Sequence, residues 1–86
     1  MKNEQAKMPP VMEVRFGNIR AAIWRNEGNN GPWYNATFSR CYVEGSEYKT
    51  TYTFGRDDLL TLAKVADLAH SEIFALQRDD RGPAED

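Results

Sequence analysis

The chain has 86 residues, of which 28% are charged, and its formal net charge is −2. A chain this short forms one domain and buries only about 60% of the surface of its unfolded form, so burial against a second copy would stabilise it. Its single cysteine, Cys41, excludes an internal disulfide, and the lack of a signal-like or membrane-length apolar run predicts a cytoplasmic protein without a membrane partner.

The charges are unevenly distributed along the chain. From Val11 to Arg56 there are six cations and four acids, a net charge of +2, whereas from Asp57 to Asp86 there are three cations and eight acids, a net charge of −5. The first part is therefore mildly basic and the second acidic. This asymmetry fits an anionic partner on one side of the protein.

The chain begins with a polar segment that ends in two prolines, and we expect residues 1–10 to form a disordered tail. Val11–Phe16 alternates apolar and polar residues, which predicts a strand. Gly17-Asn18 then predicts a bulge or a sharp bend, after which Ile19–Arg25 resumes the alternation. Asn26–Pro32 is dense in turn residues and predicts a long hairpin connection.

Two further strands follow this connection. The first is Trp33–Val43, which again alternates. Glu44-Gly45-Ser46 predicts a turn, and Tyr48–Phe54 is the last predicted strand.

Each predicted strand has an apolar side and a polar side, because successive side chains point to opposite faces. We expect the apolar sides to form the core and the polar sides to stay open to solvent. The predicted core side holds Ile19, Ala21, Ile23, Tyr34, Ala36, Phe38, Tyr52 and Phe54. The predicted open side holds Arg20, Trp24, Trp33, Asn35, Thr37, Ser39, Lys49, Thr51 and Thr53. Arg40 and Tyr42 have the core parity but lie near a strand end, where twist or a bulge could turn them outward.

The period changes after Gly55. We expect a helix over Leu59–Gln77, with Asp57 as its N-cap, because apolar residues then recur at helical spacing. The apolar arc is wider than the cover of one sheet requires, which favours a homodimer formed through the helix. The predicted dimer interface comprises Leu62, Val65, Leu68, Ala69, Ile73 and Phe74.

The order of elements predicts an α+β fold, with an antiparallel sheet of about four strands followed by one long C-terminal amphipathic helix. We expect a single β-β-β-β-α domain over residues 11–77 and a charged, mobile tail over residues 78–86.

The sequence offers no catalytic constellation, and we expect neither an enzyme nor a cofactor or small-molecule substrate. His70 lies beside Ala69 and Ile73 in the predicted helix and has no partner for general-base chemistry. Helix capping accounts for Asp57 and Asp58, so we expect no metal site. Cys41 is expected to be a small strand residue.

The predicted open side is the one set of residues that favours a function. Single-stranded nucleic acid binds through bases stacked on aromatic rings and through cations that follow the phosphates. The candidate binding residues are Arg20, Trp24, Arg25, Trp33, Asn35, Thr37, Arg40, Tyr42 and Lys49. The alternative is a protein-interaction module that uses the Trp24/Trp33 surface without nucleic acid, since tryptophan and arginine also dominate protein interfaces.

Three stretches resemble a known family. Phe16–Arg20 resembles its apolar-Gly-polar-apolar-Arg opening, and Phe38–Tyr42 resembles its second-strand ending, where an arginine and a tyrosine lie close together. Thr53–Leu60 resembles its last short strand running into the helix. The family is the single-stranded-DNA-binding one of the transcriptional coactivator positive cofactor four, of the Whirly type, with its bacterial and phage relatives. The resemblance covers about residues 14–76.

Members of that family pair through the helix and lay single-stranded DNA across their strands. The resemblance therefore implies a homodimer and implies DNA contact at Arg20, Arg40 and Tyr42. It favours a protein that binds single-stranded DNA, or RNA, with low sequence specificity in transcription, replication, recombination or repair. Such a protein would be associated with the nucleoid.

Overall fold

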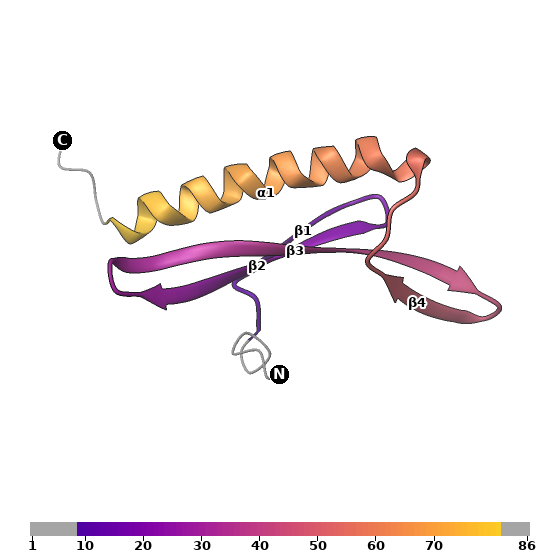
Figure 1. Ribbon diagram of the computed structural model, residues 1–86, viewed down its shortest axis with the longest axis horizontal. Helices are drawn as coiled ribbons and strands as arrows, with labels where there is room; N and C mark the ends of the chain where they lie inside the picture. Colours follow the sequence, from indigo (N-terminus) through magenta and orange to yellow (C-terminus); the bar gives the residue numbers. More distant parts are fainter. Residues whose placement is uncertain (1–8, 82–86) are drawn as a thin grey trace.

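The computed structural model describes residues 9–81, and the predicted tails at residues 1–8 and 82–86 lie outside the described residues. Four antiparallel strands in the order β1-β2-β3-β4 form one sheet, and one helix packs on it (Figure 1). This confirms the predicted α+β fold. The elements are β1 (Met12–Phe16), β2 (Ile19–Gly28), β3 (Gly31–Glu44), β4 (Glu47–Thr51), the 3-10 turn η2 (Arg56–Asp58) and α1 (Leu59–Asp80).

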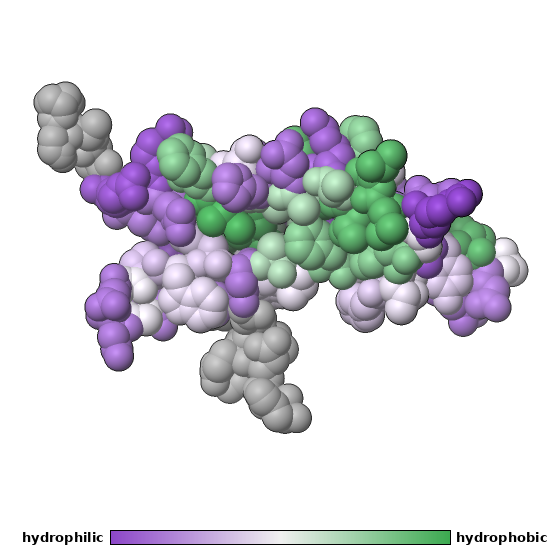
Figure 2. Space-filling model, turned by 45° about the horizontal axis from the view of Figure 1, so that its top comes forward, coloured by the Kyte–Doolittle hydropathy of each residue, from purple (hydrophilic) through white to green (hydrophobic). Residues whose placement is uncertain are grey.

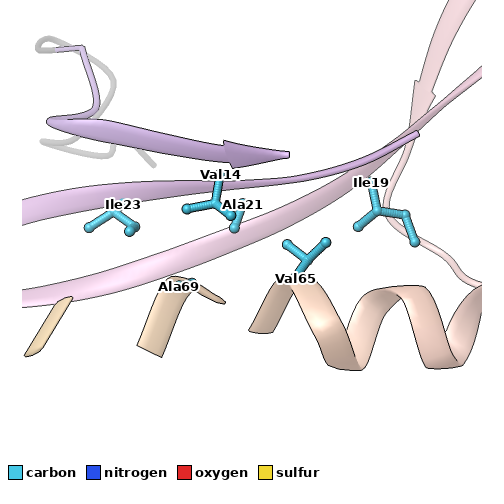
Figure 3. Packing of buried hydrophobic residues seen from close by; sticks show 6 residues of the cluster. All are labelled: Val14, Ile19, Ala21, Ile23, Val65 and Ala69. Carbon is cyan, nitrogen blue, oxygen red and sulfur yellow. The ribbon is translucent and has the colours of Figure 1, made fainter. Parts of the chain in front are cut away.

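The core lies between the sheet and the helix. Ile19, Ala21 and Ile23 of β2 point toward α1, whose Val65 lies opposite them (Figure 3), while the intervening side chains belong to the other face of the sheet. Ile19, Ile23 and Val65 are fully buried. This confirms the predicted inward side of β2, whose period of two follows from strand geometry.

The turn at Gly17-Asn18 reverses the chain, so that β1 and β2 are separate neighbouring strands. Gly17 has a φ of 64°, a left-handed conformation that glycine adopts without steric cost. The Asn18 side chain donates a 3.0 Å hydrogen bond to the carbonyl oxygen of Cys41, and the Cys41 amide donates to the Asn18 carbonyl. The predicted bend is therefore a tight hairpin that is tied to β3.

The connection between β2 and β3 is shorter than predicted. The pairing continues through Glu27 and Pro32 to Gly28 and Gly31, and only two residues remain in the loop. Gly31 has a φ of 112°, which only glycine adopts readily. The turn-forming residues thus lengthen the two strands, and the prediction of a long connecting loop over residues 26–32 is wrong.

The last predicted strand has the opposite orientation to the one expected from its pattern. β4 pairs Thr51 with Arg40, Lys49 with Tyr42 and Tyr48 with Val43. Lys49 and Thr51 therefore share the face on which the helix lies, and the prediction that they share the open side is wrong. The two-residue turn after Glu44 sets this register, and a shift of one residue exchanges the two faces of a strand.

The β3–β4 hairpin extends beyond the first turn of α1 (Figure 1). Its large side chains are consequently exposed, including Tyr48 (84% exposed) and Val43 (58% exposed). Tyr52, which was predicted in the core, follows β4 and is 73% exposed. Phe54, by contrast, packs against the core cluster as predicted.

The helix begins at Leu59, as predicted, but its N-cap residue and its last residue differ from the prediction. Asp58 is the N-cap residue, and its carboxylate accepts a 2.8 Å hydrogen bond from the Gly55 amide, whereas Asp57 is exposed beside Arg56. The helix continues to Asp80, three residues beyond the predicted Gln77, so residues 78–80 do not belong to a mobile tail.

Candidate nucleic-acid interface

The side of the sheet opposite α1 bears no helix or strand in the described part of the chain (Figure 1). We call it the open face. The strand registers place on it Glu13 and Arg15 of β1, Arg20, Ala22, Trp24 and Asn26 of β2, and Trp33, Asn35, Thr37 and Ser39 of β3. On the projecting hairpin the same face continues over Cys41 and Val43 of β3 and Thr50 and Tyr48 of β4. Both tryptophans thus lie on the uncovered side, as predicted.

Trp24 is held in place by a neighbour on β3. Its indole Nε1 donates a 3.0 Å hydrogen bond to the hydroxyl oxygen of Thr37, which is diagonal to it across the strand pair. The ring is partly buried and lies across β2 and β3. This bond fixes the orientation of the indole, so that a ligand meets a preformed surface.

Trp33 is the more accessible of the two indoles, at 49% exposed. It pairs with Asn26 and lies close to Gly28, where an added Cβ would be 3.1 Å from Cδ1 of the indole. The lack of a side chain at Gly28 therefore allows the ring to lie against the strand. An exposed, supported aromatic ring of this kind is a suitable platform for a planar ligand.

Amide and hydroxyl groups surround the two indoles. The Asn26 side chain donates a 3.2 Å hydrogen bond to the Asn35 carboxamide oxygen across the strand pair. The Thr37 side chain is exposed beside Ala22, and Ser39 beside Arg20 is buried. The face is consequently flat and polar between the aromatic rings and the cations.

The cations of the open face are Arg15 and Arg20, which are cross-strand partners of β1 and β2. Arg20 forms a 3.5 Å ion pair with Glu13, in which both side chains are more than a third exposed. Arg15 has no ion-pair partner among residues 9–81. Arg15 is not among the predicted binding residues, although its alternation with Val14 and Phe16 places it on the polar side.

Arg25, a predicted binding residue, lies on the helix side of the sheet. It pairs with Tyr34 and forms ion pairs with Glu27 and, at 3.9 Å, with Asp80 near the end of α1. Tyr34 also donates a hydrogen bond to Asp80. Burial, followed by this bond, raises the pKa of the Tyr34 phenol, and a hydrogen bond with Tyr34 raises the pKa of Arg25.

Arg40 is engaged within the protein. Its Nε atom donates a 3.2 Å hydrogen bond to the Thr53 carbonyl oxygen and lies 3.3 Å from the Asp58 carboxylate. Both side chains are only 23% exposed. Arg40 thus joins β3 to the start of the helix, and a ligand on the open face does not reach it.

Tyr42 and Lys49 lie side by side on the helix-side face of the projecting hairpin. The Arg40 guanidinium stands 5.8 Å from the centre of the Tyr42 ring, and Lys49 lies 3.8 Å from both Glu44 and Glu47. Of the nine predicted binding residues, the open face therefore brings together Arg20, Trp24, Trp33, Asn35 and Thr37. Arg25, Arg40, Tyr42 and Lys49 lie elsewhere.

The predicted dimer residues are mostly used within the protomer. Val65 and Ala69 are buried, and Leu62, Leu68 and Ile73 pack against the same core, so only Phe74 (55% exposed) faces solvent. A different set of residues is exposed on the helix, which we call the outer stripe. It consists of Leu59, Leu60, Ala63, Ala66, His70 and Phe74, and Figure 2 shows apolar surface along this side of the protein.

The described residues also bear on metal binding and on membrane spanning. Residues 9–81 contain no group of three or more histidine, cysteine or acidic side chains placed to hold a metal ion. Across the same part of the chain, no helix has both the length and the apolar character needed to cross a membrane.

No family model, curated protein or solved structure matches the chain. The resemblance to the positive cofactor four family is therefore a hypothesis that depends on three short stretches of sequence. Only the geometry of this chain bears on DNA contact and dimerisation.

Proposed function

We propose that the protein binds single-stranded nucleic acid with low sequence specificity through the open face. The observation that supports this most is the presence of two indoles and two arginines on one uncovered side of the sheet. Base stacking on an aromatic ring contributes about 1–3 kcal/mol per base and does not depend strongly on the base. Arg15 and Arg20 supply the phosphate contacts. Transcription, replication, recombination and repair all involve such a ligand.

The net charge of the open face is too small to hold a nucleic acid by itself, so the ligand must also stack its bases on the indoles. Its two arginines and Glu13 give a net charge of +1. The Arg20–Glu13 pair is exposed, and such pairs contribute little to stability, so that a phosphate can replace Glu13 at small cost. Stacking on Trp24 and Trp33 then supplies most of the binding free energy, and the salt dependence is correspondingly shallow.

The proposal includes a homodimer, for which the outer stripe is the surface. Leu60 is 85% exposed and Leu59 is 49% exposed, and both precede small residues at helical spacing. Small side chains allow two helices to approach closely, and heptad-like apolar spacing favours such packing. A dimer formed in this way leaves both open faces free for ligand.

The test is a fluorescence titration with a twenty-nucleotide oligothymidylate at low salt. The chain has only two tryptophans, so Trp24→Phe leaves Trp33 as the sole reporter. We expect quenching of Trp33 on binding, weaker binding for Trp33→Ala, and partial recovery for Trp33→Phe, which retains a ring. An unchanged emission together with no retention of the oligonucleotide at low salt would refute the proposal.

A second candidate is a protein-interaction module that uses the same tryptophans. The observation that favours it is the small net charge of the open face, because a planar, mostly polar surface with two indoles also suits a peptide. The two candidates differ in their response to Arg15→Glu with Arg20→Glu. If the protein binds nucleic acid, this double variant should lose the oligonucleotide that the unaltered protein retains. If it binds a peptide instead, neither the unaltered protein nor the variant should retain the oligonucleotide.

A further inference from the structure

We propose that the nucleic acid is an extended single strand that runs along β2, from the indoles to the arginine pair, and covers about four nucleotides per chain. This inference depends on the proposed function and adds the path, the footprint and the polarity of the ligand. It differs from the path across the strands that the family resemblance implies.

The spacing of the two indoles favours an extended ligand. Trp24 pairs with Asn35, and Trp33 pairs with Asn26, so the two tryptophans are diagonal neighbours on β2 and β3. Diagonal neighbours lie roughly 7–8 Å apart, whereas bases in one strand of a duplex rise by about 3.4 Å. Two consecutive bases can therefore occupy the two rings only if the strand is stretched and its bases are unstacked from each other.

The width of the sheet excludes a path across the strands at this level. β1 pairs with β2 only as far as Ile23, and β4 pairs with β3 only from Arg40 onward. At Trp24 and Trp33 the sheet consequently consists of β2 and β3 alone. A ligand crossing it there would leave the protein after a strand spacing of roughly 5 Å and would meet no cation on the open face.

The path along β2 meets every suitable group on the open face. Arg20 lies four residues before Trp24 on the same strand, which is about 13 Å at the rise of a strand residue. At roughly 7–8 Å per nucleotide, the spacing of the indoles, this distance corresponds to two further nucleotides. Ala22 lies between them, and its small side chain is buried, so it offers the ligand no contact of its own.

The ends of the path differ in chemistry, and this gives the ligand a direction. Two bases stack at the end formed by Trp24 and Trp33, and two phosphates bind at the end formed by Arg15 and Arg20. The second pair of nucleotides lies beside Arg15, Arg20 and Ser39, none of which is aromatic, and Tyr48 of the open face pairs with Val43, four residues beyond Ser39. The bases of this second pair should therefore contribute less than those of the first pair.

The test uses oligothymidylates of two to ten nucleotides and two half-abasic tetranucleotides, with bases only in the 5′ half or only in the 3′ half. We expect the affinity per chain to rise steeply up to about four nucleotides and then to level off. One half-abasic probe should bind within about threefold of the full tetramer, and the other at least about tenfold more weakly, since each stacked base contributes about 1–3 kcal/mol. Arg15→Gln with Arg20→Gln should make the dinucleotide and the tetranucleotide bind alike.

Equal binding of the two half-abasic probes would overturn the direction of the ligand, and an affinity that still rises steeply beyond eight nucleotides would overturn the path along β2. Both results would leave the proposed function intact. Failure of the twenty-nucleotide probe to bind would overturn both the path and the proposed function. Arg56→Gln is the matched control, because Arg56 is 94% exposed in η2 and away from the open face.

Discussion

Removing the two arginines of the open face, in Arg15→Gln with Arg20→Gln, should nearly abolish the salt dependence of oligonucleotide binding. For a single strand, log K falls with log salt by roughly 0.7 per neutralised phosphate, so two arginines give a slope of about −1.4. Between 50 and 200 mM salt the affinity of the unaltered protein should then fall by about sevenfold. The double variant should change by less than about twofold over the same range.

The assay is a titration of a twenty-nucleotide oligothymidylate at four salt concentrations, followed by Trp33 emission in the Trp24→Phe background. The matched control is Arg56→Gln with Lys64→Gln, which removes the same charge from exposed residues of η2 and α1. This control should keep the slope of the unaltered protein.

A slope near −3.5, which five engaged cations would give, would contradict the assignment of phosphate contacts to Arg15 and Arg20 alone. It would mean that Arg25, Arg40 and Lys49 leave their acidic partners and reach the ligand. The affinity would then fall by more than about a hundredfold over the same range of salt.

Three further predictions concern stability and assembly. Ile23→Val should lower the free energy of unfolding in urea by about 1 kcal/mol, because it removes a methylene group from a fully buried side chain. Phe74→Asp should convert the proposed dimer into a folded monomer of 9.8 kDa in sedimentation experiments, because Phe74 lies on the outer stripe and not in the core. Raising the pH above 10 should destabilise the protein through ionisation of Tyr34, whose pKa is raised in the fold by burial, and Tyr34→Phe should make this loss of stability shallower in alkaline urea denaturation.

Each of these predictions has its own control and its own contradictory outcome. Val43→Ala, at an exposed position, should change the unfolding free energy by only a few tenths of a kcal/mol, and a cost equal to that of Ile23→Val would argue against the core as described. An unfolded Phe74→Asp variant would show that the fold needs Phe74, and a dimer that survives the change would place the interface elsewhere. An unaltered alkaline profile in Tyr34→Phe would show that ionisation of Tyr34 does not cause the loss of stability at high pH.

The alternating pattern was sufficient to predict the two-layer fold and the side on which the tryptophans lie. In β2, buried Ile19, Ala21 and Ile23 alternate with the open-face residues Arg20 and Trp24, so the period of two assigned both faces. The helix was equally clear, because its apolar residues recur at helical spacing.

The faces of β4 could not be obtained in the same way. Its residues are exposed on both sides, so neither face has the apolar character that would define it, and the turn after Glu44 decides the register. The pattern of tyrosines suggested a core side and placed Lys49 on the open side. Aromatic residues on a projecting hairpin give the same alternation as aromatic residues in a core.

The surroundings of the predicted binding arginines could not be obtained from the sequence, for a related reason. A sequence shows which residues are cations but not which acids they meet, and Arg25 and Arg40 each meet an acid in α1 or just before it. Both arginines bring together elements that are distant in sequence. Arg15 and Arg20, which are cross-strand partners in a hairpin, were the two that local alternation and a tight turn could have identified together.

The two faces of the sheet thus use their large and charged residues differently. On the helix side, small and branched residues fill the core, and the described residues leave no buried side-chain polar atom without a hydrogen-bond partner. That side accounts for folding without any contribution from Trp33, which is half exposed on the opposite face. Because a solvated strand gains little from such a residue, its position next to a fixed second indole is better explained by a planar ligand than by stability.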